Sequence, residues 1–223
     1  MTLKLFIQAV CKFFAGLLIM GALLFLPAGT FNYPQAWLLL CILFIPMFIA
    51  GLVMMAVNPD LLRKRLSAKE EQGEQKTVIL LSSIMFLAAF VLAGLSFRFG
   101  WLLLPKWVSY AAAAVFLAGY ILYAEVLREN TYLSRTVEVQ EGQKVIDTGL
   151  YGIVRHPMYM STFLIFLSMP LVLGSLISFI IMLCYIPIIG KRMKNEELVL
   201  EEGLEGYREY KQRVRYKVIP FIW

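Results

Sequence analysis

The sequence has a single histidine, His156, and only three cysteines in 223 residues. Cys11, Cys41 and Cys184 all lie inside apolar runs, and their spacing forms no pairs. Zinc sites need clustered cysteine and histidine ligands, and disulfide frameworks need paired cysteines. The sequence therefore argues against both, and we expect no metal in this protein.

Charged residues are also scarce. They make up 16% of the chain, against about 25% in an average soluble domain, and 60% of the residues are hydrophobic. The net charge is +6, but the basic residues lie in loops beside apolar runs. This placement favours membrane lipids as partners and argues against nucleic acid.

Long apolar runs take up most of the chain. A membrane helix needs about 20 apolar residues to cross the hydrocarbon layer. The run from Met158 to Ile189 would be too long for one crossing, and Pro170 and Gly174 interrupt it, so we expect a helical hairpin that turns near Gly174. We predict an all-α, polytopic integral membrane protein of about six membrane helices, the last two forming this hairpin. The first four spans are predicted at Leu5–Leu26, Ala36–Val57, Val78–Phe97 and Trp107–Leu127.

Basic residues predict the orientation in the membrane. They concentrate in the segments 58–76, 128–157 and 191–223, while Arg98 and Lys106 are the basic residues expected on the other side. With six crossings, all the basic segments face one side, which the positive-inside rule assigns to the cytoplasm. The chain is thus predicted to be multi-pass, with both termini cytoplasmic.

Shorter signals refine this picture. Asn58 and Pro59 predict the capped start of a short amphipathic surface helix, followed by a charged linker at 69–76. The small residues of the fourth span, Ala111 to Ala114, Ala118 and Gly119, predict close packing against another helix. Near the end of that span, Glu125 fits either a cavity or a surface position.

The polar end of the chain, from Lys191 to Trp223, is predicted to leave the membrane as a charged helix. Leu200, Leu204, Tyr207 and Val214 would form its apolar side. Its acidic residues are predicted to form a solvated face; they are Glu201, Glu202, Glu205 and Glu209.

The stretch from Gly149 to Tyr159 combines Arg155, His156 and Pro157. Proline is favoured in the first turn of a helix, so the hairpin should begin at Pro157. The hairpin would bring this stretch to Arg192, Glu196 and Glu197, where Arg192 and Glu196 share a helix face. Simpler readings remain open: Arg192 and Glu196 as an ordinary surface ion pair, and His156 bound to a backbone carbonyl.

These residues together resemble the isoprenylcysteine carboxyl methyltransferase family, which overlaps in motif with membrane phospholipid methyltransferases. The resemblance rests on Gly149–Tyr159, the apolar hairpin, Arg192 with Glu196-Glu197, the Tyr207–Val214 pattern and the terminal Ile219–Ile222. It covers roughly residues 128–223 and, more weakly, 58–65. We therefore divide the chain into a four-helix membrane region, 1–127, and a catalytic region, 128–223.

The resemblance implies a cytoplasmic pocket for S-adenosyl-L-methionine and a lipophilic small-molecule or lipidated substrate. Arg192 and His156 would be the catalytic residues, with Arg192 facing the reacting group of the substrate. In the family, the segment that corresponds to residues 143–146 contains a histidine, which this chain lacks there. Carried over position by position, the cofactor-binding residues would be Gln140, Gln143, Lys144, Val145, Ile146, Tyr151, His156, Pro157, Met158, Tyr159 and Glu196.

The chemistry of methyl transfer is compatible with these residues, because it needs alignment of two bound substrates more than proton transfer. A carboxylate at Glu196 can bind an ammonium or ribose hydroxyls, and Arg192 can bind a carboxylate substrate. An amine acceptor would call for a base, with His156 and Glu197 as candidates.

Two other functions remain open from the sequence. One is an NADPH-dependent membrane reductase of the sterol-reductase type, which carries a related Arg-His stretch. Pro157 and the Glu196-Glu197 pair favour the methyltransferase over it. The other is a non-enzymatic transporter or assembly factor, although transport sites usually lie near the middle of the membrane rather than at one face.

Overall fold

The computed structural model describes residues 3–66, 73–133 and 137–223. Within these ranges the chain folds into helices joined by loops, and the only β-type pairing is an isolated bridge between Leu103 and Ser175. Half of the predicted linker 69–76, residues 69–72, lies outside the described residues, as does Arg135 of the basic segment 128–157. The other half was wrongly predicted as a linker, because residues 73–76 belong to the helix Gly73–Phe99.

The first four predicted spans are long helices. Each has between 24 and 27 residues, or about 36–40 Å at 1.5 Å per residue, enough to cross a hydrocarbon layer of about 30 Å. They are α1 (Leu3–Ala28), α2 (Pro34–Val57), α4 (Gly73–Phe99) and α5 (Lys106–Glu129).

The short surface helix is α3 (Pro59–Leu66). The side chain of Asn58 accepts a hydrogen bond from the Leu61 amide at 3.0 Å, so the predicted cap is confirmed. Lys12 of α1 donates to the carbonyl of Leu66 at 2.6 Å, which ties the end of α3 to the first span.

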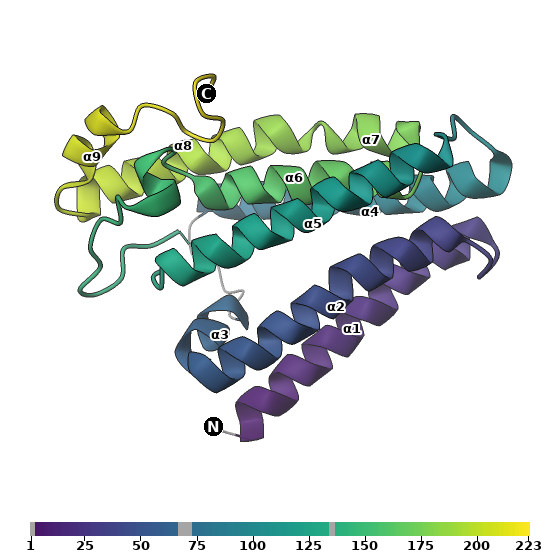
Figure 1. Ribbon diagram of the computed structural model, residues 1–223, viewed down its shortest axis with the longest axis horizontal. Helices are drawn as coiled ribbons and strands as arrows, with labels where there is room; N and C mark the ends of the chain where they lie inside the picture. Colours follow the sequence, from purple (N-terminus) through teal and green to yellow (C-terminus); the bar gives the residue numbers. More distant parts are fainter. Residues whose placement is uncertain (1–2, 67–72, 134–136) are drawn as a thin grey trace.

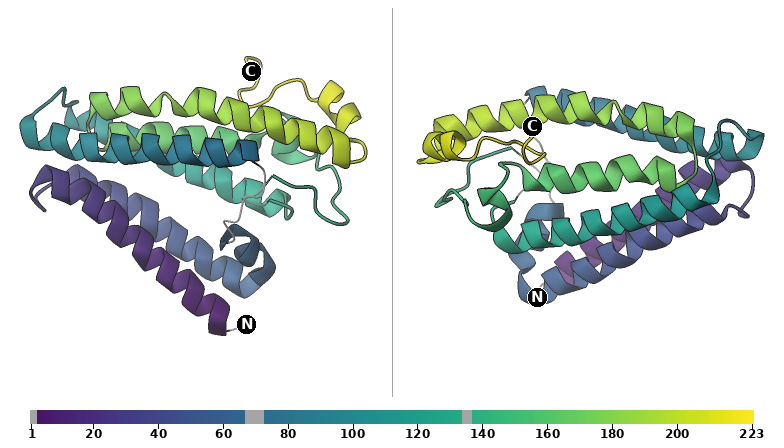
Figure 2. Two further views of the ribbon diagram at one scale, coloured as in Figure 1. Left: turned by 180° about the vertical axis from the view of Figure 1, so that it is seen from behind. Right: turned by 45° about the horizontal axis from the view of Figure 1, so that its top comes forward.

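The predicted hairpin is confirmed, with its turn at Gly174, where φ is +72°. Its first arm is α6 (Pro157–Val172), and its second arm consists of α7 (Leu176–Met182) followed by α8 (Tyr185–Gly203). Figure 2 shows the two arms side by side. Among the described residues, five helical segments are long and apolar enough to cross a membrane, Leu176–Gly203 among them, and α6 is a shorter apolar helix. The chain is thus an all-α polytopic membrane protein.

Helix α6 packs closely on α5. A Cβ atom placed on Gly119 would lie 2.9 Å from Cγ1 of Ile165, so only glycine allows this approach. Ala112 and Ala113 of α5 are also buried. The predicted small-residue face is narrower than expected, because Ala111, Ala114 and Ala118 are exposed. This contact positions the start of α6, where the site lies.

The two ends of the bundle differ in character. Figure 1 shows α3, the connection after α5, α9 and the C-terminus at one end, and the turns between spans at the other. At the latter end, the Leu104 amide donates to the Gly174 carbonyl at 2.8 Å, and the Tyr33 hydroxyl donates to the Leu173 carbonyl at 2.8 Å. The polar segments that the sequence assigns to one face therefore lie together.

The prediction of a single charged helix from Lys191 was wrong. Helix α8 ends at Gly203, and α9 (Tyr207–Arg213) follows Gly206, whose φ of +82° reverses the chain. Leu200, Leu204, Tyr207 and Val214 still pack together, but they come from two helices and the residues beside them.

Candidate functional site

The site begins in the loop before α6. Residues Gly149–Gly152 form a short 3₁₀ helix, and α6 starts at Pro157 with His156 as its cap residue, as predicted. Gly149 has a φ of +50°, and a Cβ atom there would lie 1.4 Å from a carboxylate oxygen of Glu129. That carboxylate accepts the Leu150 amide at 3.1 Å, so Glu129 fixes the start of the loop on the end of α5.

The tail of the chain lies along this loop. The backbone amides of Arg155 and His156 donate to the carbonyls of Tyr216 and Lys217 at 2.9 and 2.8 Å. The Arg155 guanidinium donates to the carbonyls of Val214 and Arg215 at 2.7 and 2.8 Å. Arg155 thus fastens the tail to the motif.

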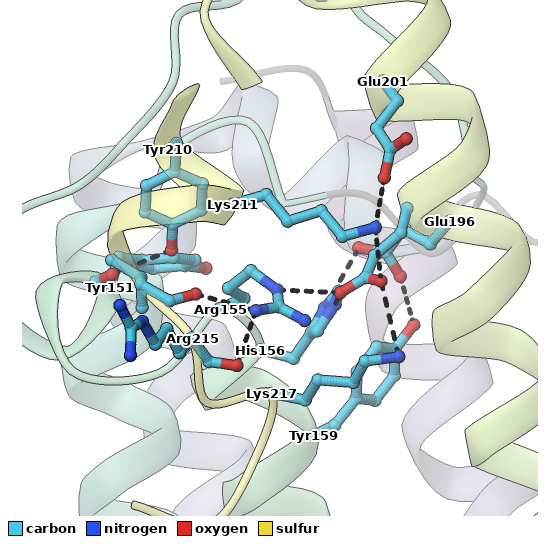
Figure 3. A network of polar contacts seen from close by, with 12 residues as sticks. Tyr151, Arg155, His156, Tyr159, Glu196, Glu201, Tyr210, Lys211, Arg215 and Lys217 are labelled. Atoms are coloured by element: carbon cyan, nitrogen blue, oxygen red, sulfur yellow. Dashed lines mark hydrogen bonds and ion pairs between the residues drawn. The ribbon is translucent and has the colours of Figure 1, made fainter. Parts of the chain in front are cut away.

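Glu197 is the centre of a buried charge cluster. Its carboxylate is 2.9 Å from Nε of Arg155 and 3.2 Å from Nε2 of His156. Lys217 and Lys211 reach it at 3.4 and 3.5 Å. Figure 3 shows the side chains of Arg155, His156, Lys211 and Lys217 converging on this point. His156 therefore contacts a carboxylate and not the backbone carbonyl of the simpler reading.

Tyr159 connects Arg192 and Glu196, the two residues of α8 that the simpler reading treats as an ordinary surface ion pair. Its hydroxyl donates to Oε2 of Glu196 at 2.5 Å and accepts a hydrogen bond from Nε of Arg192 at 3.0 Å. Nδ1 of His156 lies 4.0 Å from the other oxygen of Glu196. The Glu196 carboxylate is thus held in place from α6, which differs from an ordinary surface ion pair within one helix.

A second group of hydrogen bonds joins Tyr151 to both sides of the site. Its hydroxyl accepts from the Asn130 side chain at 3.0 Å, and its carbonyl accepts from the Tyr210 hydroxyl at 2.8 Å. Burial raises the pKa of Tyr151 and of Tyr210 well above the usual value of a phenol. Both tyrosines therefore remain neutral at physiological pH.

These elements enclose a pocket between the loop, the start of α6, α8 and α9. Ten of the twelve predicted site residues line it: Gln143, Lys144, Val145, Ile146, Tyr151, His156, Met158, Tyr159, Arg192 and Glu196. Gln140 and Pro157 are not part of the wall. The Gln140 side chain donates to the Tyr132 carbonyl within the loop, and Pro157 is buried in the first turn of α6.

The pocket wall also contains residues that the prediction omitted. They are Asn130, Tyr132, Leu133, Val137, Glu138, Arg155, Val199, Leu200, Leu204, Tyr207 and Tyr210. Tyr207 and Tyr210 belong to a motif that the resemblance quoted without a role. Nothing in the sequence except helical spacing marked the apolar residues of α8, so they could not be predicted as pocket residues.

The structure decides the setting of Glu125, which the sequence left open, and changes the setting of Glu201. Glu125 is on the surface and pairs with Arg128, whose Nε lies 2.9 Å from Oε2, so the cavity alternative does not hold. Glu201, expected on the solvated face, pairs with Lys211. Its three acidic neighbours are exposed as predicted.

Comparison with known proteins confirms the family resemblance over part of the second half of the chain, which does not include the Tyr207–Val214 pattern or residues 58–65. Residues 111–202 match the isoprenylcysteine carboxyl methyltransferase (ICMT) family. Two sterol reductases are also similar. Delta(14)-sterol reductase TM7SF2 of Mus musculus is 28% identical over 91 residues, which are 40% of this chain and 22% of the relative. Delta(14)-sterol reductase of Methylotuvimicrobium alcaliphilum is 23% identical over 135 residues, or 54% and 32%. The chain therefore matches less than a third of each of these relatives.

Proposed function

We propose that this chain, whose residues 111–202 match the isoprenylcysteine carboxyl methyltransferase family, is a membrane methyltransferase that uses S-adenosylmethionine. Its acceptor would be lipophilic, a prenylcysteine-like carboxylate or a lipid head group, and the pocket would face the cytoplasm. In this proposal residues 128–223 form the catalytic region on the membrane region 1–127.

The observation that carries the proposal is the setting of Glu196. Its carboxylate is fixed by Tyr159 in a pocket wall that also contains Val145, Val199 and Leu200. A fixed carboxylate binds an ammonium group or ribose hydroxyls, and the apolar side chains suit a flat heterocycle. This donor set fits S-adenosylmethionine, which supplies a methyl group on a sulfonium and carries all of these parts.

The remaining residues would position the acceptor. Arg192, held at the pocket by Tyr159, can bind a carboxylate or phosphate of the acceptor. The pocket lies where α6 and α8 reach the end of the bundle, so a lipid can reach it from the membrane with its apolar part left among the helices. Bringing donor and acceptor into line is the main requirement of this reaction.

The two reductases favour a second candidate, an NADPH-dependent membrane reductase. NADPH carries several phosphate groups and needs a strongly cationic site. Among the described residues, the cationic groups of the wall are Lys144, Arg155 and Arg192, and Arg155 already binds Glu197 and two carbonyls. Glu138 and Glu196 add negative charge to the same wall. The charges of the pocket wall thus favour S-adenosylmethionine, whose sulfonium and ammonium groups are cationic, over the anionic NADPH.

The test is calorimetric binding of S-adenosylhomocysteine and of NADPH to the detergent-purified protein. We expect S-adenosylhomocysteine to bind, and Glu196→Ala to weaken it by about tenfold or more, since a hydrogen bond to a charged group contributes about 1.5–3 kcal/mol. Glu205→Ala is the matched control, because Glu205 is exposed outside the pocket wall. Binding of NADPH alone would refute the proposal, and an equal loss in both variants would refute the placement of the site.

A further inference from the structure

Tyr207 lines the pocket, and the environment of its hydroxyl group is unusual for a buried tyrosine. It is the first residue of α9, its side chain lines the pocket, and it is 4% exposed. Within the part of the chain that the structure describes, its hydroxyl oxygen is buried and has no hydrogen-bond partner. A buried hydroxyl without a partner costs about 1–3 kcal/mol, so such groups call for a specific explanation.

Its neighbour Tyr210 provides the contrast. The two rings lie 5.7 Å apart, and both belong to the same apolar cluster with Leu204 and Val214. The Tyr210 hydroxyl donates to the Tyr151 carbonyl at 2.8 Å. Packing therefore accounts for both rings, and a protein partner accounts for the hydroxyl of Tyr210, but none of the described residues provides a partner for the hydroxyl of Tyr207.

The surroundings of Tyr207 restrict what that group can be. Burial, followed by the nearby carboxylates of Glu197 and Glu196, raises the pKa of Tyr207 well above that of a free phenol. The hydroxyl thus stays protonated and can donate a hydrogen bond, while the same carboxylates disfavour an anionic acceptor. Val145 and Leu200, packed on the cluster, present an apolar surface beside it.

We propose that the Tyr207 hydroxyl donates a hydrogen bond to a ring nitrogen of the adenine of the bound cofactor. This inference rests on the proposed function, and it adds to Glu196 a neutral donor that recognises the base. A purine nitrogen is an uncharged acceptor at the edge of a flat aromatic ring, and the faces of that ring pack well against apolar side chains. The charges and the apolar side chains around Tyr207 favour such a group.

The experiment compares wild type with Tyr207→Phe and Tyr210→Phe, measuring thermal unfolding without ligand and calorimetric affinity for S-adenosylhomocysteine. Tyr207→Phe should unfold at the same or a higher temperature than wild type, because no hydrogen bond to the described residues is lost, yet bind about five- to tenfold more weakly. Tyr210→Phe should unfold at a lower temperature, because the Tyr151 carbonyl loses its donor. Unchanged affinity in Tyr207→Phe, or a loss accompanied by a lower unfolding temperature, would overturn the inference.

Analogues of S-adenosylhomocysteine that lack the 1-, 3- or 7-nitrogen of the purine identify the acceptor. One analogue should bind wild type more weakly than S-adenosylhomocysteine does. The same analogue and S-adenosylhomocysteine should bind the Tyr207→Phe protein equally well. If none shows this coupling, the assignment to the adenine ring is wrong. If wild type fails to bind S-adenosylhomocysteine at all, the proposed function fails and this inference with it, whereas binding that Tyr207→Phe leaves intact refutes the inference alone.

Discussion

At the scale of single residues, Glu197 is the acidic residue on which the charged groups of the site converge. It is 4% exposed and lies within ion-pairing distance of Arg155, His156, Lys211 and Lys217. Arg155 and His156 precede α6, whereas the two lysines come from the end of the chain. A carboxylate in this position attracts the cationic groups of the loop, of α9 and of the tail, and its removal would leave Arg155 buried without a counterion.

We therefore expect Glu197→Gln to destabilise the protein by about 3 kcal/mol or more, the usual result of breaking a buried ion pair. The measurement is denaturant-induced unfolding in detergent. Glu202→Gln serves as the control, since Glu202 is exposed on the same helix. Equal stability of the two variants would mean that the cluster contributes nothing to the docking of the tail.

At the scale of secondary-structure elements, the site depends on how closely α6 approaches α5. Gly119 faces Leu164 and Ile165, and a Cβ atom there would lie 3.0 and 2.9 Å from their side chains. Helix α6 carries His156 and Tyr159 at its first turn. A change in its position would move both residues relative to Glu196 and Glu197 on α8.

Gly119→Leu should force α5 and α6 apart at a cost of about 1–3 kcal/mol or more, as overpacking does. We expect a lower unfolding temperature together with weaker binding of S-adenosylhomocysteine. Ala118→Leu introduces the same side chain at an exposed position of the same helix and should change neither. A Gly119→Leu protein that binds as wild type does would show that the pocket tolerates movement of α6.

At the scale of the whole molecule, the sequence predicted the path of the chain better than the contacts within the site. The lengths of the apolar runs and the position of Gly174 were enough to predict the hairpin, and the basic segments were enough to predict which end of it is polar. Both features are constrained by the membrane, which requires apolar spans of a certain length and places basic residues on one side. The Tyr159 bridge and the Glu197 cluster depend on the register between α6 and α8, which no one-dimensional pattern contains. The turn at Gly206 was missed because helical spacing alone fits one long helix as well as two packed ones.

The orientation of the bundle is the remaining property of the whole molecule, and the distribution of charge predicts it. The end that contains the pocket carries the basic segments and should face the cytoplasm, whereas the end with Lys106 should face outward. In a background with Cys11, Cys41 and Cys184 changed to Ala, single cysteines can be placed at exposed positions by Lys106→Cys, Glu141→Cys and Gln212→Cys. In right-side-out vesicles a membrane-impermeant maleimide should label only the Lys106→Cys protein. After permeabilisation, the maleimide should also label the Glu141→Cys and Gln212→Cys proteins. The reverse labelling pattern would show that the bundle has the opposite orientation. Arg213 of α9 contacts Asp147 of the loop at 2.6 Å, so Glu141→Cys and Gln212→Cys should be labelled from the same side. Different labelling of these two proteins would contradict a site in which the loop and the tail meet.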